Sequence, residues 1–222
     1  VEDLDRKVLT FGFSEDCNVR AINTELQDGL FCCDVVHDGN LYCRMKLRVP
    51  GQHNLLNALA SAAVAIHLGV PSDDFAKGIG AYNGVGRRFE FKKNWRGAKV
   101  YDDYSHHPTE ITAALKAALD LKPNRVICVF QPHTYSRTVS LLDDFAGALA
   151  YADNIILCPI YAARETNTYG VSSQDLADRI PGAGVANDLR HAAQLLEELV
   201  QPGDLIFTMG AGDVNRIVQY LK

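Results

Sequence analysis

The chain has 222 residues, which is enough for one large domain or two small ones with a buried core. Its formal net charge of −5 argues against a nucleic-acid-binding surface. The longest alanine-rich run, residues 58–68, is too short to span a bilayer, and no signal peptide opens the chain. We therefore expect a cytoplasmic protein with no nucleic-acid or membrane partner, and no feature of the sequence indicates an obligate protein partner.

The six cysteines do not form a recognisable disulfide or metal pattern. None has C-x-x-C spacing, and most fall in apparent strands, where a cysteine behaves as a small apolar side chain. We expect reduced thiols and no cysteine-based metal site. The cysteines in apparent strands are Cys32, Cys33, Cys43, Cys128 and Cys158.

Residues 1 to about 49 alternate between apolar and polar side chains, as antiparallel strands do. Turn signals at 14–16 and 38–40 separate the predicted strands, which are 7–13, 18–26, 29–37 and 41–49. The opening Val1–Leu4 carries no start signal for a helix or strand, so we expect the chain to begin inside a larger protein.

Two helices are predicted next, over residues 52–68 and 73–82. The first is so rich in alanine that it must pack closely on a neighbour. His53, Asn54 and Asn57 stand in its first turns, where unpaired amides and the positive end of the helix dipole favour an acceptor or an anion. The alternative is a helix start whose polar residues simply face water.

The pattern changes at Gly84-Val85-Gly86, where we place a domain boundary at about residue 86. Arg87 is predicted to begin a strand that runs through Phe91, and strands then alternate with helices to the end of the chain. This rhythm predicts an α/β fold with a mostly parallel sheet covered on both faces. The further predicted strands are 98–102, 125–130, 154–158 and 204–208.

Two consecutive strand–loop–helix units carry most of the polar chemistry. The loop after the first strand contains residues 102–107 and ends at Pro108, and the loop after the second contains residues 131–137. Right-handed crossovers between parallel strands place both loops at the carboxyl edge of the sheet, where open α/β sheets bind ligands. Two histidine-bearing loops, from adjacent strands, should therefore face one crevice.

Several residues of these loops suit an anionic ligand. His106 and His107 precede a helix start, where a substrate carboxylate would meet both amide N–H groups and imidazoles. A zinc site with His133 is the alternative, but no Cys, Asp or Glu has a convincing spacing for it. Arg137 stands in the first turn of the second helix, where a positive charge is unfavourable by about 0.3–1 kcal/mol, so a bound anion explains it better than stability does.

Other candidates have an equally plausible structural explanation. Asp102 and Asp103 can bind ribose hydroxyls or a metal, and Arg87 and Arg88 can bind a phosphate. Neighbouring strand residues point to opposite faces, so we expect at most one of each pair to serve a ligand. Arg164, in the polar loop 162–171, either lines the crevice or is solvated. The Gly210–Asp213 segment is interpreted as a tight packing turn, with Asp213 capping the next helix.

Five segments together resemble the Mur ligases, and most closely the members that add L-alanine to UDP-N-acetylmuramate. They are GQHNLLNALAS, GVGRRFE, VYDDYSHHPTEI, FQPHTYSRT and FTMGAGD, in this order and at these separations. The resemblance extends over essentially the whole chain. The pair DDYSHHPTE and QPHTYSRT is specific, whereas GAGD alone would not be.

The resemblance implies the later part of a three-domain enzyme. Residues 1–86 would be the rear part of the central ATP-binding domain, and 87–222 a Rossmann-like C-terminal domain that binds the amino acid. No G-x-x-x-x-G-K-[ST] motif occurs in the chain, so we expect the P-loop and the main Mg²⁺ ligands to lie outside it. Such a fragment is expected to be inactive alone.

The resemblance also implies a reaction and a set of site residues. The reaction is ATP-dependent amide formation in peptidoglycan precursor synthesis, in which the muramoyl carboxylate is phosphorylated and the amine of L-alanine attacks the acyl phosphate. ATP, Mg²⁺, L-alanine and UDP-N-acetylmuramate are the implied cofactors and substrates. The implied catalytic residues are His106, His133 and Arg137; the substrate-binding residues Tyr104, His107, Thr134 and Arg164; and the nucleotide-binding residues His53, Asn54, Arg87, Arg88, Asp102 and Asp103.

One departure from the family pattern bears on substrate binding. Related ligases often carry a basic residue directly after the histidine of the second loop, where this chain has Thr134. Substrate positioning would then depend more on Arg137. Two other functions remain open, namely a ligase that recycles a cell-wall tripeptide and a non-catalytic module that binds a nucleotide or anion.

Overall fold

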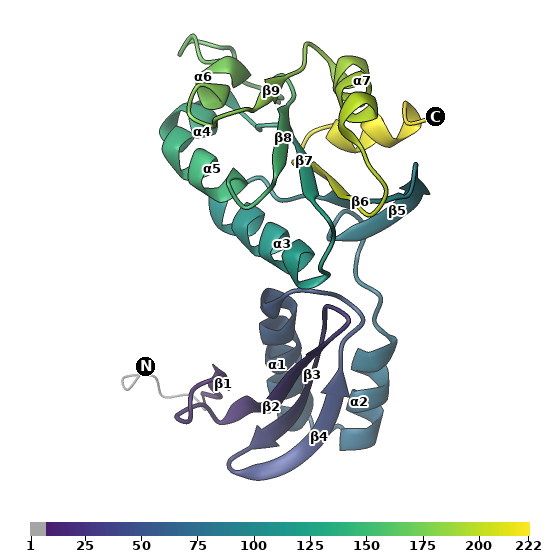
Figure 1. The fold of residues 1–222 in the computed structure, drawn as a ribbon. Coiled ribbons are helices and arrows are strands. Elements are labelled where there is room, and N and C mark those ends of the chain that lie inside the picture. The colour runs from purple at the N-terminus through teal and green to yellow at the C-terminus, as the bar shows by residue number, and fades with distance from the viewer. Residues whose placement is uncertain (1–7) are drawn as a thin grey trace. The chain divides into compact units, whose positions relative to one another are not determined.

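The computed structural model describes residues 8–222 and divides the chain into two compact units, Val1–Gly84 and Val85–Lys222 (Figure 1). Residues 1–7 lie outside the described part, and with them the opening Val1–Leu4 and the first residue of the predicted strand 7–13. Each unit is described below by itself.

The first unit contains a four-stranded sheet with the strand order β1-β2-β3-β4. Strands β2, β3 and β4 are antiparallel, as predicted. Strand β1 differs, because it has two residues and pairs in parallel with β2. The Asn18 side chain accepts hydrogen bonds from the backbone and hydroxyl of Thr10, which aligns the two segments without a hairpin. The strands are β1 (Phe11–Gly12), β2 (Val19–Gln27), β3 (Leu30–His37) and β4 (Asn40–Lys46).

Two helices, α1 (Gln52–His67) and α2 (Ser72–Ala81), complete the first unit. The alanines of α1 allow the close packing that the sequence predicts, because Ala58, Ala62 and Ala63 lie in one buried cluster with Cys33 and Cys43. Burial raises the pKa of Cys33 to about 12 and that of Cys43 to about 11, so both thiols stay protonated near neutral pH. All six cysteines of the chain are unpaired.

The second unit contains a six-stranded sheet with the strand order β5-β6-β10-β7-β8-β9. All neighbouring pairs are parallel except β5 with β6, which confirms the predicted mostly parallel sheet. The strands are β5 (Glu90–Trp95), β6 (Ala98–Asp103), β7 (Val126–Phe130), β8 (Asn154–Leu157), β9 (Gly184–Val185) and β10 (Leu205–Met209).

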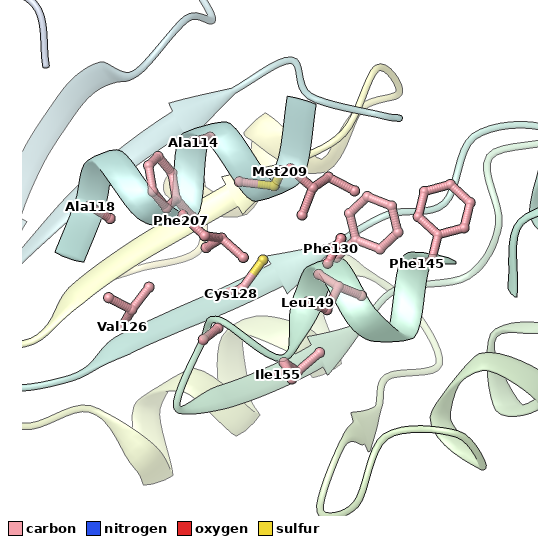
Figure 2. Close-up of a cluster of buried hydrophobic side chains, with 14 of the residues drawn as sticks. Ala114, Ala118, Val126, Cys128, Phe130, Phe145, Leu149, Ile155, Phe207 and Met209 are labelled. Carbon is pink, nitrogen blue, oxygen red and sulfur yellow. The ribbon is translucent and has the colours of Figure 1, made fainter. Parts of the chain in front are cut away.

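Helices cover both faces of this sheet, as predicted. Val126, Cys128 and Phe130 of β7 pack against α3 and α5 on one face, with Phe207 and Met209 of β10 beside them (Figure 2). The alternate residues of the same strands pack against α7 and η1 on the other face. The helices are α3 (Pro108–Asp120), α4 (Tyr135–Ser140), α5 (Leu142–Leu149), α6 (Ser173–Ala177), α7 (Leu189–Leu199) and the 3₁₀ helix η1 (Val214–Gln219). None of the helices within residues 8–222 has the length and hydrophobicity needed to cross a membrane.

The strand order corrects one expectation about the two histidine loops. Strands β6 and β7 are not neighbours, because the last strand of the chain, β10, pairs with both of them. Local sequence patterns do not indicate that β10 lies between β6 and β7. As a result, the Gly210–Asp213 turn that follows β10 emerges between the two loops.

The segment before β5 corrects a second expectation. Arg87 and Arg88 form a turn, and the strand begins only at Glu90. Arg87 and Phe89 have φ angles of 60° and 48°, which a strand does not accommodate. This turn is held in place because the Phe89 N–H donates to the Asp103 carboxylate at 2.8 Å and the Tyr104 N–H donates to the Arg87 carbonyl at 2.7 Å.

Candidate functional site

The two histidine loops meet at the carboxyl edge of the six-stranded sheet. His106 follows β6 and His133 follows β7, and their ring centroids are 6.1 Å apart at an interplanar angle of 60°. Tyr104 lies on the other side of His106, with its ring centroid 5.4 Å away. The two loops therefore meet at this edge, although a strand separates their parent strands.

His106 is oriented by hydrogen bonds from its own loop and from α3. Its Nδ1 lies 3.0 Å from the Tyr104 carbonyl and 3.4 Å from the Glu110 carboxylate, and its backbone N–H donates to Glu110 at 3.1 Å. Burial acts to raise the pKa of Glu110, but the hydrogen bond from His106 and the charges of His106 and Arg88 outweigh it, so this pKa is lowered. A hydrogen on Nδ1 serves these acceptors and leaves Nε2 for a ligand.

His107 has a different position from its neighbour. It is exposed and is the N-cap residue of α3, where its Nδ1 accepts a hydrogen bond from the Thr109 N–H at 3.3 Å. Pro108 occupies the first helical position, as predicted. Of the two adjacent histidines, His106 is the one that contacts the second loop.

His133 is held by Tyr161, which follows β8. The two rings are stacked with centroids 5.5 Å apart and an interplanar angle of 16°. Burial lowers the pKa of His133, and the charges of Arg137 and His106 lower it further, against the opposing effect of Glu165. His133 is therefore a neutral imidazole near pH 7, able to accept a proton.

Arg137 and His133 carry the two unsatisfied atoms of the site. Nδ1 of His133 and Nη1 of Arg137 are buried, and neither has a hydrogen-bond partner among residues 8–222. Leaving a buried polar atom unpaired costs about 1–3 kcal/mol, and more when the group is charged. An anionic ligand with hydrogen-bonding oxygens would satisfy both atoms.

The turn that carries these residues is strained and firmly held. Thr134 has φ 68° and ψ 142°, a conformation that β-branched residues rarely adopt. Its carbonyl accepts hydrogen bonds from the hydroxyl and the N–H of Thr138, at 2.7 and 3.2 Å. The Glu165 carboxylate accepts from the N–H and hydroxyl of Ser136, and these hydrogen bonds lower the pKa of Glu165.

The two arginines before β5 approach the same aromatic ring. The guanidinium carbons of Arg87 and Arg88 lie 4.8 and 5.6 Å from the centroid of the Tyr104 ring. The expectation that they point to opposite faces was therefore wrong, because they lie in a turn and not in a strand. Arg88 is 3.5 Å from Glu110, and 47% of its side chain is exposed. It is the member of the pair that is open to a ligand.

Arg87 is occupied by contacts within its own unit. Its Nε donates to Asp102 at 3.1 Å, its Nη1 to the Gly212 carbonyl at 3.2 Å and its Nη2 to the Gly210 carbonyl at 2.7 Å. Burial raises the pKa of Asp102, while the Thr208 hydroxyl and Arg87 act in the opposite direction. These bonds tie β6 to the turn after β10.

Asp103 is also buried and has protein partners. Besides the Phe89 N–H, its carboxylate accepts hydrogen bonds from the N–H and hydroxyl of Ser105. Both aspartates thus stabilise the loops around the crevice. Within residues 8–222, no group of three or more His, Cys, Asp and Glu side chains is arranged to hold a metal ion.

The Gly210–Asp213 turn is the tight packing turn that the sequence predicts. A Cβ at Gly210 would lie 2.7 Å from the Gln131 carbonyl, and one at Gly212 would lie 2.7 Å from Cγ of Tyr161. The predicted cap is wrong, because the Asp213 carboxylate accepts from Nε2 of Gln131 at 2.9 Å. The side-chain oxygen of Gln131 instead accepts from the Val214 N–H at the start of η1, at 3.1 Å.

The remaining candidates belong to the first unit or to the loop after β8. Asn54, in the first unit, donates from its side chain to the Pro50 carbonyl at 2.8 Å and so helps to fix the start of α1. Gly51 precedes this helix with φ 99° and no side-chain cap. His53 is exposed beside Asn54, and Arg164 is exposed in the loop after β8.

Sequence patterns missed several residues that shape the crevice. Tyr161, Glu110 and Gln131 all contact or orient the predicted site residues. Glu165, which the sequence places with Arg164 as a residue that either lines the crevice or is solvated, accepts hydrogen bonds from Ser136. Tyr161 gave the clearest signal, because it follows an apolar strand of the same parallel sheet and so reaches the same edge.

The chain was compared with known proteins. A family model described as "Mur ligase, glutamate ligase domain" matches residues 87–212. The UDP-N-acetylmuramate–L-alanine ligase of Clostridium novyi (strain NT) is 46% identical over 220 residues, covering 97% of this chain and 48% of the relative. The corresponding ligase of Brucella anthropi is 39% identical, covering 96% and 47%.

A solved structure gives the same result for the fold. The UDP-N-acetylmuramate-alanine ligase of Thermotoga maritima superimposes with a TM-score of 0.81 at 25% identity, covering 96% of this chain and 46% of that one. The chain thus spans about half the length of the curated relatives it matches. Since the family model matches more than half of the chain, at the residues that form the crevice, the chain belongs to the Mur ligase family.

Proposed function

We propose that this chain is the amino-acid-binding part of an ATP-dependent ligase that joins L-alanine to UDP-N-acetylmuramate in peptidoglycan precursor synthesis. The observation that carries the proposal is the pair of buried nitrogens on His133 and Arg137 that have no hydrogen-bond partner within residues 8–222. A carboxylate or acyl phosphate supplies the oxygens that these atoms lack. The names of the relatives support L-alanine as the amino acid.

In the proposed reaction, the amine of L-alanine attacks the carbonyl carbon of an acyl phosphate, an amide bond forms and phosphate leaves. The Arg137 guanidinium binds the carboxylate of the amino acid or the oxygens of the leaving phosphate. His133, kept neutral by its surroundings, accepts a proton from the attacking amine. His106 presents Nε2 to the same space because its Nδ1 is engaged.

The other predicted residues take supporting places in this proposal. Tyr104 forms one wall beside His106, and His107, Thr134 and Arg164 are proposed to border the substrate. Arg88 is proposed as the phosphate-binding arginine, with Arg87 serving to hold the loops. Asp102 and Asp103 would approach the ribose, and His53 and Asn54 the adenine.

We also propose the domain assignment that the resemblance implies. Residues 1–86 belong to an ATP-binding central domain and 87–222 to the domain that binds the amino acid. ATP is then a substrate of the complete enzyme, and the ligands of Mg²⁺ lie largely outside the residues described here. This chain alone is expected neither to hydrolyse ATP nor to form product.

The direct test is Arg137→Ala in the full-length ligase that contains this chain. We expect alanine-dependent phosphate release to fall about 100-fold, as is typical when one member of a buried charge pair is removed. Arg137→Lys should retain part of the activity, because it keeps the charge but loses the planar fork. The matched control is Arg179→Ala, since Arg179 forms an exposed ion pair with Asp143. Near-normal turnover of Arg137→Ala would refute the proposed role.

Two assays separate the alternatives. Phosphate release that is stimulated by a cell-wall tripeptide, and not by L-alanine, would assign the chain to the recycling ligases. Calorimetric titration of the 222-residue chain with ATP and with L-alanine tests the non-catalytic alternative. Strong ATP binding by the chain alone would favour a nucleotide-binding module.

A further inference from the structure

The Tyr161 ring contacts two parts of the crevice at once. It is stacked on the His133 imidazole, with centroids 5.5 Å apart. It also lies against Gly212, where any side chain would collide with it, because a Cβ there would be 2.7 Å from Cγ of Tyr161. The ring therefore lies where the loops after β7, β8 and β10 converge.

The backbone of Tyr161 is joined to the turn that carries His133. Its N–H donates to the Pro132 carbonyl at 2.8 Å, and its carbonyl accepts from the Thr134 N–H at 2.9 Å. These two bonds form a parallel bridge between His133 and Tyr161, outside the named strands. Any shift of Tyr161 is thus transmitted to the residues on both sides of His133.

Core packing does not explain this tyrosine. Its side chain is 39% exposed, whereas Phe130 and Phe207 are fully buried, and it belongs to neither hydrophobic cluster of its unit. Meanwhile the Nδ1 of His133 has no hydrogen bond within residues 8–222 that would fix the imidazole. Stacking on Tyr161, worth about 0.5–1.5 kcal/mol, therefore restrains this side chain together with the edge contact to the His106 ring.

We propose that Tyr161 is a positioning residue that holds the His133 imidazole toward His106 and Arg137, and that position 212 is glycine to leave room for this ring and for Oε1 of Gln131, which lies nearer still. The expected effect of Tyr161 on ligation rests on the proposed function. The expected effect of Tyr161 on His133 does not, because it concerns only the orientation and surroundings of one imidazole.

The first test measures His133 in the 222-residue chain without substrate. Histidine ring signals are followed by NMR from pH 5 to 8, and the His133 signals are assigned by their loss in His133→Gln. In Tyr161→Ala, water reaches the freed face of the imidazole, so its pKa should rise toward the ordinary value of 6.5. The charged groups that face it, Arg137, His106 and Glu165, are unchanged in this variant.

The variants separate positioning from other roles. Tyr161→Phe keeps the ring and should leave both the His133 titration and the nuclear Overhauser contact between His106 and His133 intact. Tyr161→Ala should weaken that contact. Tyr169→Ala is the control, because Tyr169 is an exposed tyrosine of the same loop region. An unchanged His133 titration in a folded Tyr161→Ala would overturn the proposal.

The second test measures kinetics in the full-length ligase. Tyr161→Ala should lower kcat/KM for L-alanine about 10- to 100-fold, the cost of misplacing a reacting group by about 1 Å. The acid limb of its pH profile should move to higher pH together with the pKa of His133. Tyr161→Phe should remain near wild type, and an equal loss in Tyr161→Phe would overturn the proposal by pointing to a direct role of the hydroxyl.

The NMR test and the kinetic test can refute different proposals. If the His133 signals change in Tyr161→Ala while alanine-dependent turnover stays normal, the positioning role is supported and the proposed ligase role of His133 is refuted. If neither changes, the positioning proposal itself is refuted.

Discussion

At the scale of single residues, the crevice is distinguished by side chains that the protein leaves incompletely satisfied. Nδ1 of His133 and Nη1 of Arg137 are buried without a hydrogen-bond partner among the described residues, although neighbouring groups such as Glu110 and Asp102 are well bonded. Leaving these buried nitrogens without hydrogen bonds lowers the free energy of unfolding. This cost indicates that a ligand completes the site.

The lowered pKa of His133 makes a prediction about acid stability. Because the folded-state pKa lies below the ordinary value of 6.5, the unfolded chain binds the proton more tightly than the folded chain. The free energy of unfolding should therefore fall as the pH drops below about 6.5, and it should fall less in His133→Gln. Urea unfolding, followed by the fluorescence of Trp95, the single tryptophan, reports this unit directly. Equal acid sensitivity of the two proteins would contradict the prediction.

The strained conformation of Thr134 makes a second prediction. Its φ of 68° costs about 1–3 kcal/mol for a residue with a Cβ. We expect Thr134→Gly to be more stable than Thr134→Ala, because glycine removes the strain and alanine retains it. At Thr109, in the first turn of α3, the order should reverse: Thr109→Ala should be more stable than Thr109→Gly, since glycine is unfavourable in a helix. Thermal unfolding of the four variants gives the comparison, and the same order at both positions would refute it.

At the scale of elements, Arg87 joins the end of β6 to the turn after β10. It contacts Asp102 and the carbonyls of Gly210 and Gly212, and Asp102 is fully buried. We expect Arg87→Met to lower the free energy of unfolding by about 3 kcal/mol, because it leaves the Asp102 carboxylate buried without its partner. Adding Asp102→Asn should restore part of the loss.

The double variant tests whether the unpaired Asp102 carboxylate causes the loss of stability in Arg87→Met. Urea unfolding gives the free energy of each protein, and the coupling is the difference between the double variant and the sum of the single ones. If Asp102→Asn does not recover any stability in the Arg87→Met background, the cost does not come from the unpaired carboxylate.

The elements also show what the sequence can and cannot specify. Apolar runs predicted β6, β7, β8 and β10 to within one or two residues, and the His107-Pro108 signal predicted the start of α3. The insertion of β10 between β6 and β7 could not be predicted, because strand order depends on long-range pairing. The turn at Arg87 was missed for a related reason, since its backbone is held by Tyr104 and Asp103. Tyr161 was missed because its contacts with His133 and Gly212 join segments that are distant in the sequence.

At the scale of the whole molecule, the second unit has its own sheet and its own hydrophobic clusters. Its sheet is covered on both faces by helices from residues 85–222, and the two histidine loops belong entirely to it. We predict that residues 85–222 fold when expressed alone and retain the contact between His106 and His133. A dispersed NMR spectrum that overlays that of the 222-residue chain would confirm this, and a collapsed spectrum would contradict it.

The central place of β10 has a consequence for how this unit is made in the cell. Residues 205–209 pair with β6 on one side and with β7 on the other, so they complete the middle of the sheet. During translation β6 can pair with β5, and β7 with β8, but the edges of β6 and β7 that face β10 stay open until residues 205–209 are available. A nascent chain that stalls before β10 would therefore expose two inner strand edges that are prone to aggregate.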